Sequence, residues 1–295
     1  KTLKYGLREN YYEPTGKFYI EPRAQLSITL TPKAYLKFSA GKYYQFVNKI
    51  LTYSTSSFRS VWTVSDGDRF PVVSSKHYTA GALFRFPKSL TLDIEGYIRN
   101  TQDIVTVQTV LRRESGVRVR QEQIFNSIDN KTIGLDMMLH KEFGFAQAWI
   151  AYTLSRSINQ SDNINRGNAY PSLYDQLHEL KIASTGRWKG WGYSFAAIFG
   201  SGKPWDEPLF TTNFQLASDY EKNSNRLPPY LRLDIGFSYA RKVNGVDLKA
   251  GVNVFNLLNK NNILSRVYTL SGTPLITYLD TGTPLIYSDI MGMGI

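Results

Sequence analysis

The sequence contains no cysteine, which excludes a disulfide framework and metal sites built on thiolates. It also has no apolar run near the roughly 18 consecutive residues that a membrane-spanning helix requires. Its mean hydropathy is -0.30, the value of a polar chain. A helical membrane protein is therefore excluded. A transmembrane β-barrel is compatible with such an average, because only alternate residues of its strands face lipid.

Histidine is scarce as well. The three histidines, His77, His140 and His178, lie far apart in the sequence, and none belongs to an HExxH or similar spacing that would bind a metal. No nucleophile elbow or catalytic dyad accompanies them. We therefore predict that the chain is not an enzyme and binds no cofactor.

Two short segments look like binding motifs but lack essential residues. Residues 200–203 (GSGK) resemble a phosphate loop, yet Ala197 stands where the first glycine belongs and Pro204 replaces the hydroxyl residue that would hold magnesium. Residues 66–68 (DGD) lack the rest of a calcium loop. We interpret the first segment as the end of a strand and the second as a turn.

The charge and the aromatic content need an explanation of their own. The net charge is +11, but Lys and Arg are scattered and form no run, so we predict no nucleic-acid partner. Aromatic residues make up 14% of the chain. Tyrosine and tryptophan concentrate where membrane proteins meet the lipid–water interface, which accounts for a high aromatic content.

The dominant pattern has a period of two residues, as in half-buried strands. In residues 246–254, for example, Val, Leu, Ala, Val and Val alternate with Asp, Lys, Gly and Asn. Each alternating segment is near the 9 to 11 residues of a tilted membrane strand. Residues 1–12 also read as extended, and the further strands are expected at residues 18–30, 33–46, 76–86, 89–100, 132–141, 145–157, 176–188, 191–201, 230–241 and 246–255.

The connections between these segments alternate between short and long. The short ones carry turn residues and lie at residues 31–32, 87–88, 142–144, 188–190 and 243–245. The long ones are polar and lie at residues 47–75, 101–131, 158–175, 202–229 and 256–289. Outer-membrane barrels have short periplasmic turns and long extracellular loops. The sequence thus predicts an all-β protein, a transmembrane antiparallel up-and-down β-barrel, of which about 11 to 12 strands are present.

The polar faces of the strands would line the inside of such a barrel. Charged residues on those faces include Arg232 and Asp234, and we expect most of them to form a mixed-charge wall. Ligand contact is better placed near the outer rim, where aromatic and polar side chains converge. The candidate substrate-binding residues are Tyr43, Gln45, His77, Arg99, Trp205, Tyr230, Arg232 and Asn253.

Several segments together resemble the C-terminal part of the barrel of TonB-dependent outer-membrane receptors. They are residues 6–8 (GLR), 21–23 (EPR), 41–46 (GKYYQF), 152–157 (YTLSRS), 200–204 (GSGKP), 227–234 (LPPYLRLD) and 252–259 (VNVFNLLN). Their order and spacing extend over nearly the whole chain.

This resemblance implies a barrel of about 22 strands that encloses an N-terminal plug and is energised by TonB. Residues 1–295 would form the C-terminal portion, without the plug, the first strands and the closing strand. The implied location is the outer membrane of a Gram-negative bacterium. The implied partners are the TonB complex, outer-membrane lipid and lipopolysaccharide, a surface lipoprotein and the ligand: a ferric siderophore, cobalamin, an oligosaccharide or a peptide.

Two other functions remain open at this stage. A passive pore or autotransporter-like barrel would need only about 12 strands, and an outer-membrane hydrolase would need a nucleophile beside a base at the rim. A plug-sized domain upstream of Lys1 would favour the receptor, whereas a signal peptide directly upstream would favour the pore.

Overall fold

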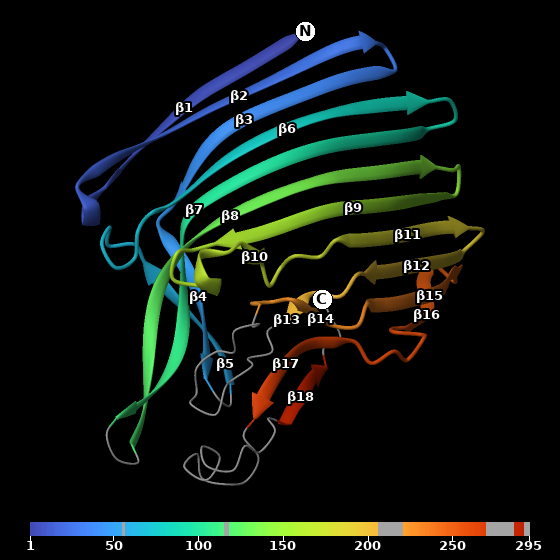
Figure 1. The fold of residues 1–295 in the computed structure, drawn as a ribbon. Coiled ribbons are helices and arrows are strands. Elements are labelled where there is room, and N and C mark those ends of the chain that lie inside the picture. The colour runs from blue at the N-terminus through green and yellow to red at the C-terminus, as the bar shows by residue number, and fades with distance from the viewer. Residues whose placement is uncertain (55–56, 115–117, 206–220, 270–285, 292–295) are drawn as a thin grey trace.

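The computed structural model describes residues 1–54, 57–114, 118–205, 221–269 and 286–291. It is built around one 12-stranded antiparallel sheet that curves like part of a barrel wall (Figure 1). Eleven of these strands follow one another in chain order, and β10 (Tyr170–Pro171) pairs with the end of β9. The eleven are β1 (Thr2–Tyr12), β2 (Lys17–Thr31), β3 (Ala34–Gln45), β6 (Val73–Phe86), β7 (Leu90–Glu114), β8 (Arg118–Glu142), β9 (Ala146–Gln160), β11 (His178–Trp188), β12 (Trp191–Gly200), β15 (Tyr230–Val243) and β16 (Val246–Val254). The predicted antiparallel, up-and-down fold is confirmed.

All the predicted short turns lie at one end of the sheet, on the right in Figure 1. Asn244 and Gly245 have φ values of 49° and 84°, and Lys189 and Gly190 have 48° and 88°. Positive φ at both central residues defines the hairpin turn whose twist matches that of the flanking strands. The strands of each hairpin are therefore joined with a fixed register, such as Val243 opposite Val246.

The two faces of the sheet differ in chemistry. On one face the apolar side chains have no protein cover: Phe237 is 55% exposed, and Val252, opposite it, is 59% exposed. Ile98 and Ile133, likewise opposite each other, are 38% and 50% exposed. A continuous exposed apolar band is what the lipid-facing wall of a barrel requires. We refer to it as the apolar face and to its reverse as the polar face.

The prediction that residues 101–131 form a long polar connection between two strands is wrong. Strands β7 and β8 continue through most of it as a single long hairpin, 25 residues each, that extends beyond the other strands (Figure 1). The β-branched residues of 104–110 (IVTVQTV) favour extended backbone, although polar residues dominate the rest of the segment.

This extension has a small hydrophobic core. The hairpin of β4 (Val47–Ser54) and β5 (Ser57–Val64) packs beside β7, and Ile50, Val105 and Val107 form a buried cluster against Phe70 and Phe125. A second cluster forms nearby from Ile128, Ile164 and Tyr170. The parts of residues 47–75, 101–131 and 158–175 that carry these two clusters are therefore packed structures.

The remaining elements are short. They are the 3-10 helices η1 (Glu13–Thr15) and η2 (Asn165–Gly167) and the strand pairs β13 (Pro204–Trp205) with β14 (Asn225–Arg226) and β17 (Ile263–Thr269) with β18 (Ile286–Met291). Residues 206–220 and 270–285, within two predicted long loops, lie outside the described residues. Residues 286–291 pair with β17 in a separate two-stranded sheet. The described residues include no helix long and apolar enough to cross a membrane.

Pro22 lies within β2, and the pairing with β1 shows no bulge there. The register between β1 and β2 continues through Leu7 opposite Pro22, whereas the pairing of β2 with β3 stops at Arg23 opposite Gly41. Proline has no N–H to donate, so the ladder loses a bond here. Where the pairing of β2 with β3 has stopped, the Tyr44 N–H donates to the Glu21 carboxylate at 2.9 Å.

Candidate functional site

The polar face carries a wall of paired charges. Lys37 and Glu95 lie on either side of Gly81 in the register, and the Lys37 Nζ reaches the carboxylates of Asp93 and Glu95 at 2.8 and 3.3 Å. A Cβ at position 81 would lie 2.6 Å from the Ile94 carbonyl oxygen, so only glycine fits beneath this contact. Arg232 and Asp234 form a further pair at 2.7 Å. These residues neutralise one another as the predicted mixed-charge wall does.

Three of the candidate binding residues come together on β3, β6 and β7, toward the ends of β3 and β6 that lie away from the short turns. The Tyr43 and His77 rings lie 4.7 Å apart, and Arg99 stands opposite His77 in the register. The Arg23 guanidinium lies 4.8 Å from the centre of the Tyr43 ring, and His77 Nε2 lies 2.9 Å from the Ser75 hydroxyl. We call Arg23, Tyr43, His77 and Arg99 the rim cluster. It offers cationic and aromatic groups that suit an anionic or aromatic ligand.

The rim cluster is held in place by a buried carboxylate. Glu21 is 3% exposed and accepts a hydrogen bond from Arg23 Nη2 at 2.6 Å, while Arg8 lies 3.8 Å away. The side chain of Arg23 is 44% exposed, so its outer surface stays open to solvent. The cluster thus combines a buried carboxylate that holds Arg23 in place with guanidinium N–H groups that remain accessible.

The other candidates lie elsewhere. Gln45 donates a hydrogen bond from its side chain to the Val47 carbonyl at the base of β4, and Trp205 is 9% exposed in β13, opposite Asn225. Tyr230 begins β15 opposite Gly200. The eight candidates therefore do not form one site, because β15 and β16 are separated from β3 by six and seven strands of the sheet, respectively.

Arg232 and Asn253 lie on those last two strands. The Asp234 carboxylate that pairs with Arg232 also accepts the Asn256 N–H at 2.8 Å. Asn253 stands opposite Gly236 and lines a hollow of about 780 Å³ together with Glu142 at the end of β8. Arg232 is thus engaged within the wall, and Asn253 faces a separate space.

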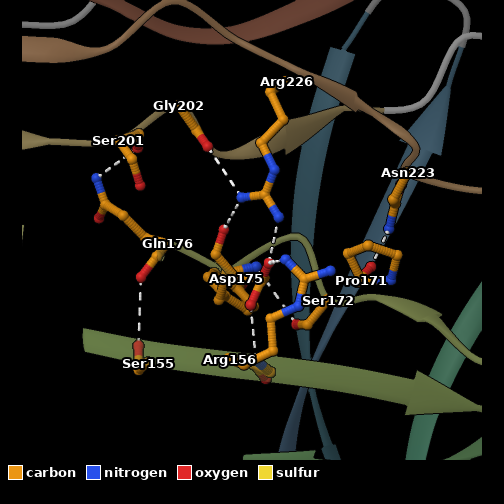
Figure 2. Close-up of polar contacts among 12 residues, drawn as sticks. Ser155, Arg156, Pro171, Ser172, Asp175, Gln176, Ser201, Gly202, Asn223 and Arg226 are labelled. Atoms are coloured by element: carbon orange, nitrogen blue, oxygen red, sulfur yellow. Dashed lines mark hydrogen bonds and ion pairs between the residues drawn. The ribbon is translucent and has the colours of Figure 1, made fainter. Parts of the chain in front are cut away.

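Sequence reasoning missed Asp175, a buried carboxylate in the connection between β9 and β11. Figure 2 shows its carboxylate between two guanidinium groups: Arg156 Nη1 lies 3.1 Å from Oδ2, and Arg226 Nη2 also donates to Oδ2. The Ser157 N–H donates to Oδ1 at 2.6 Å. The side chain of Asp175 has no exposed surface. Several charge-assisted bonds therefore offset the cost of burying this carboxylate.

Asp175 and its neighbours connect the segment before β11 with the segment after β12. Arg226 also donates to the carbonyls of Asp175 and Gly202, at 3.0 and 3.1 Å, and the Asn223 side chain donates to the Pro171 carbonyl at 2.8 Å (Figure 2). A Cβ at position 202 would lie 1.6 Å from the Leu227 carbonyl oxygen. The backbones of the two segments thus approach closely, and a guanidinium joins them. No local motif could have revealed contacts between residues about fifty positions apart.

The histidines and the segments that mimic motifs have structural contacts. His140 stacks on Trp149 with ring centres 5.5 Å apart, and His178 Nδ1 lies 2.8 Å from the Tyr152 hydroxyl. No group of three or more His, Asp or Glu side chains within the described part of the chain is arranged to hold a metal ion. The predicted strand end at Gly200 is confirmed.

The turn predicted at residues 66–68 is present, and its hydrogen bonds extend to Phe70. The Asp66 Oδ1 accepts hydrogen bonds from the Asp68 and Phe70 N–H groups at 2.9 and 2.8 Å. These bonds favour the ionised carboxylate, and the Phe70 N–H, followed by that of Asp68, holds the Asp66 pKa below its usual value. The segment has the geometry of a turn stabilised by its own first side chain.

No family model and no curated protein matches the sequence. Solved structures do match the fold. The outer membrane transporter YddB from Escherichia coli has a TM-score of 0.60 at 13% identity, and the match covers 89% of this chain and 40% of YddB. The siderophore receptor PirA from Acinetobacter baumannii has a TM-score of 0.58 at 13% identity, covering 88% and 39%. The ferric-catecholate import receptor Fiu from E. coli K12 has a TM-score of 0.53 at 12% identity, covering 85% and 32%.

The chain therefore spans about two-fifths or less of the length of the solved structures that it matches. The resemblance to the barrel of TonB-dependent receptors is confirmed at the level of the fold. This chain has the architecture of part of the barrel wall of outer-membrane transport receptors.

Proposed function

We propose that residues 1–295 form part of the barrel of an outer-membrane receptor that imports a scarce solute with energy supplied through TonB. The observation that carries the proposal is the antiparallel wall with an exposed apolar face, short turns at one end and longer connections at the other. Among the proteins with similar folds are import receptors for siderophores. In this proposal the short turns face the periplasm and the long connections face outward.

The ligand would be a ferric siderophore, cobalamin, an oligosaccharide or a peptide, and the rim cluster would make first contact with it. Arg23 and Arg99 supply cations, and Tyr43 and His77 supply stacking surfaces. Among these classes the cluster best suits an anionic, aromatic chelate, because guanidinium groups bind carboxylate and catecholate oxygens and rings stack on aromatic groups.

Energy coupling is tested by uptake of radiolabelled ferric chelates, cobalamin, oligosaccharides and peptides into cells that produce the complete protein. We expect accumulation of one class to stop when the proton gradient of the inner membrane is collapsed. Uptake that continues unchanged would support a passive pore and refute the energised receptor.

The rim cluster is tested with two matched double variants of the complete protein. Tyr43→Ala with Arg99→Ala should weaken ligand binding at least tenfold. Tyr35→Ala with Arg85→Ala removes a similar pair at the short-turn end, where the Arg85 guanidinium lies 4.9 Å from the Tyr35 ring centre, and should leave binding unchanged. Equal losses in both variants would mean that the rim cluster is not the binding surface.

A further inference from the structure

His77 is the member of the rim cluster whose charge can change near neutral pH, because imidazole titrates in that range. It lies on β6, between Tyr43 of β3 and Arg99 of β7. The Tyr43 and His77 rings are 4.7 Å apart, and Arg99 stands directly opposite His77 in the register. Cross-strand neighbours point to the same side of a sheet. The imidazole therefore has an aromatic ring on one side and a guanidinium on the other.

The hydrogen-bond partner of His77 suits both protonation states of the imidazole. His77 Nε2 lies 2.9 Å from the Ser75 hydroxyl. That hydroxyl also lies 2.8 Å from the Thr101 hydroxyl and 3.4 Å from the Asn100 carbonyl oxygen. A serine hydroxyl has one proton and two lone pairs, so it can donate to the neutral nitrogen or accept from the N–H of an imidazolium. Protonation of His77 at Nε2 therefore requires only a rotation of the Ser75 hydroxyl toward one of its other partners.

The charges around the imidazole are mostly positive. On the strands beside β6 and on their neighbours, the charged and titratable side chains nearest to His77 on the polar face are Arg8, Glu21, Arg23, Tyr43, Tyr97 and Arg99. Glu21 is the single carboxylate in this set, and it is engaged by Arg23 at 2.6 Å and Arg8 at 3.8 Å. A positive charge on His77 would therefore lie beside Arg99 with little compensation. The site without ligand favours the neutral imidazole.

An anion bound to the rim cluster would reverse this preference. Guanidinium groups bind carboxylate and catecholate oxygens through charge-assisted hydrogen bonds. Because Arg99 and His77 are direct cross-strand neighbours, an oxygen bound to Arg99 would lie close to the imidazole as well. An opposite charge within about 4 to 6 Å favours the charged form of a titrating group. The bound anion would thus stabilise the imidazolium, which in turn supplies a further cation to the ligand.

We propose that the rim cluster takes up a proton at His77 when it binds an anionic ligand. Since this concerns the regulation of the same site, it rests on the proposed function. A complex that holds more protons than the free site becomes more stable as the pH falls. The affinity should therefore rise as the pH falls through the range in which His77 titrates, and it should become constant below that range. Acidification of the medium would load the receptor more fully.

The first test measures binding of the gallium(III) complex of a hexadentate tris-catechol chelator, an aromatic anion, to the complete protein in detergent. From pH 8 to pH 6 the dissociation constant of the unsubstituted protein should fall about fivefold more than that of His77→Gln, as a rise of about one unit in the titration midpoint predicts. Comparison with His77→Gln divides out any protonation of the chelate. His178→Gln is the matched control, because His178 stands opposite Leu154 on the apolar face and contacts the Tyr152 hydroxyl. It should behave as the unsubstituted protein does.

The second test observes the proton on His77 directly and does not depend on the affinity of a variant. Gallium(III) is diamagnetic, so the complete protein with ¹⁵N-labelled histidine can be titrated by nuclear magnetic resonance with the chelate bound. The titration midpoint of His77 should move to higher pH by about one unit when the chelate saturates the site. The midpoints of His140 and His178, which lie outside the rim cluster, should stay where they are.

Two results would overturn proton uptake alone. They are the same pH dependence of binding in the unsubstituted protein and in His77→Gln, and a His77 midpoint that does not move although the chelate is bound. Failure of the proposed function has a different signature. The chelate would then bind equally well to the variant that lacks Tyr43 and Arg99 and to its control at the short-turn end. Absence of chelate binding at both pH values would refute the anionic ligand and the proton uptake together.

Discussion

Strand β8 contains two regions that are held in place by different means. Between Lys131 and Glu142 it pairs with β7 on one side and β9 on the other, and its apolar Ile133 is half exposed. Between Arg118 and Ile128 it pairs with β7, while its pairing with β9 begins only at Asp129. There Ile128 is 8% exposed and belongs to a buried cluster.

The difference shows how one hairpin serves two solvents. Residues 131–142, which we call the lower region of β8, form backbone hydrogen bonds with two neighbouring strands and expose their apolar side chains, as a lipid environment requires. Residues 118–128, which we call the upper region of β8, have fewer neighbouring strands. Their apolar side chains pack against β4 and the segment near η2, because apolar surface in contact with water is unfavourable. The lower region should therefore depend on lipid, and the upper region on side-chain contacts.

A charge on the apolar face of the lower region should give the largest loss of stability. Leu135 lies between Gly96 and Leu154 in the register. Leu135→Arg should reduce the free energy of unfolding in lipid vesicles by about 2 to 4 kcal/mol, the cost of arginine near the bilayer midplane. Asp136→Arg, one residue along and on the polar face, should cost much less. Similar losses of stability in the two variants would mean that the apolar and polar faces have been assigned wrongly.

Removal of the buried carboxylate should loosen the outer segments but not the wall. Asp175→Ala leaves Arg156 and Arg226 without their shared partner. Because the two guanidiniums are 45% and 31% exposed, water replaces part of the lost interaction, and we expect a local loss of about 2 kcal/mol. Amide exchange in residues 158–175 should accelerate, with unchanged heat resistance of the barrel. Asp162→Ala, at an exposed site of the same segment, is the matched control, and acceleration there would contradict the role of Asp175.

The wall could be predicted from the sequence because its determinants are local. Alternation with a period of two assigns the faces, and pairs such as Asn244 and Gly245 locate the turns. These two signals also place Tyr43 and His77 on one face, although the sequence does not show that they touch. The contact of Asp175 with Arg226 could not be predicted, since neither residue belongs to a pattern and 51 positions separate them.

A smaller change in the core of the upper region should sharpen the comparison. Ile50 is 3% exposed and packs with Val105 and Val107. Ile50→Val should reduce the local stability of this cluster by about 1 kcal/mol, through the loss of one buried methyl group. Faster amide exchange in residues 47–50 and 104–107 would show it, with no change in residues 131–142. Val64→Ala, at a site 58% exposed on the paired strand, should have almost no effect.

The smallest expected effect is a pH dependence confined to the turn at residues 66–70. Hydrogen bonds from the Phe70 and Asp68 N–H groups hold the Asp66 pKa below its usual value of 3.8. A lowered pKa in the folded turn means that the ionised carboxylate stabilises it. This contribution is complete above the unfolded pKa and is lost as the pH falls through the folded pKa.

Amide exchange of residues 68 and 70, divided by the intrinsic rate at each pH, should therefore increase from pH 6 to pH 3. Asp66→Asn keeps an acceptor oxygen but cannot titrate, so its exchange ratio should be the same at both pH values. A ratio that changes equally in Asp66→Asn would assign the effect to another group, whereas a change restricted to the unsubstituted protein would show that the turn depends on its own first side chain while the wall below it does not respond.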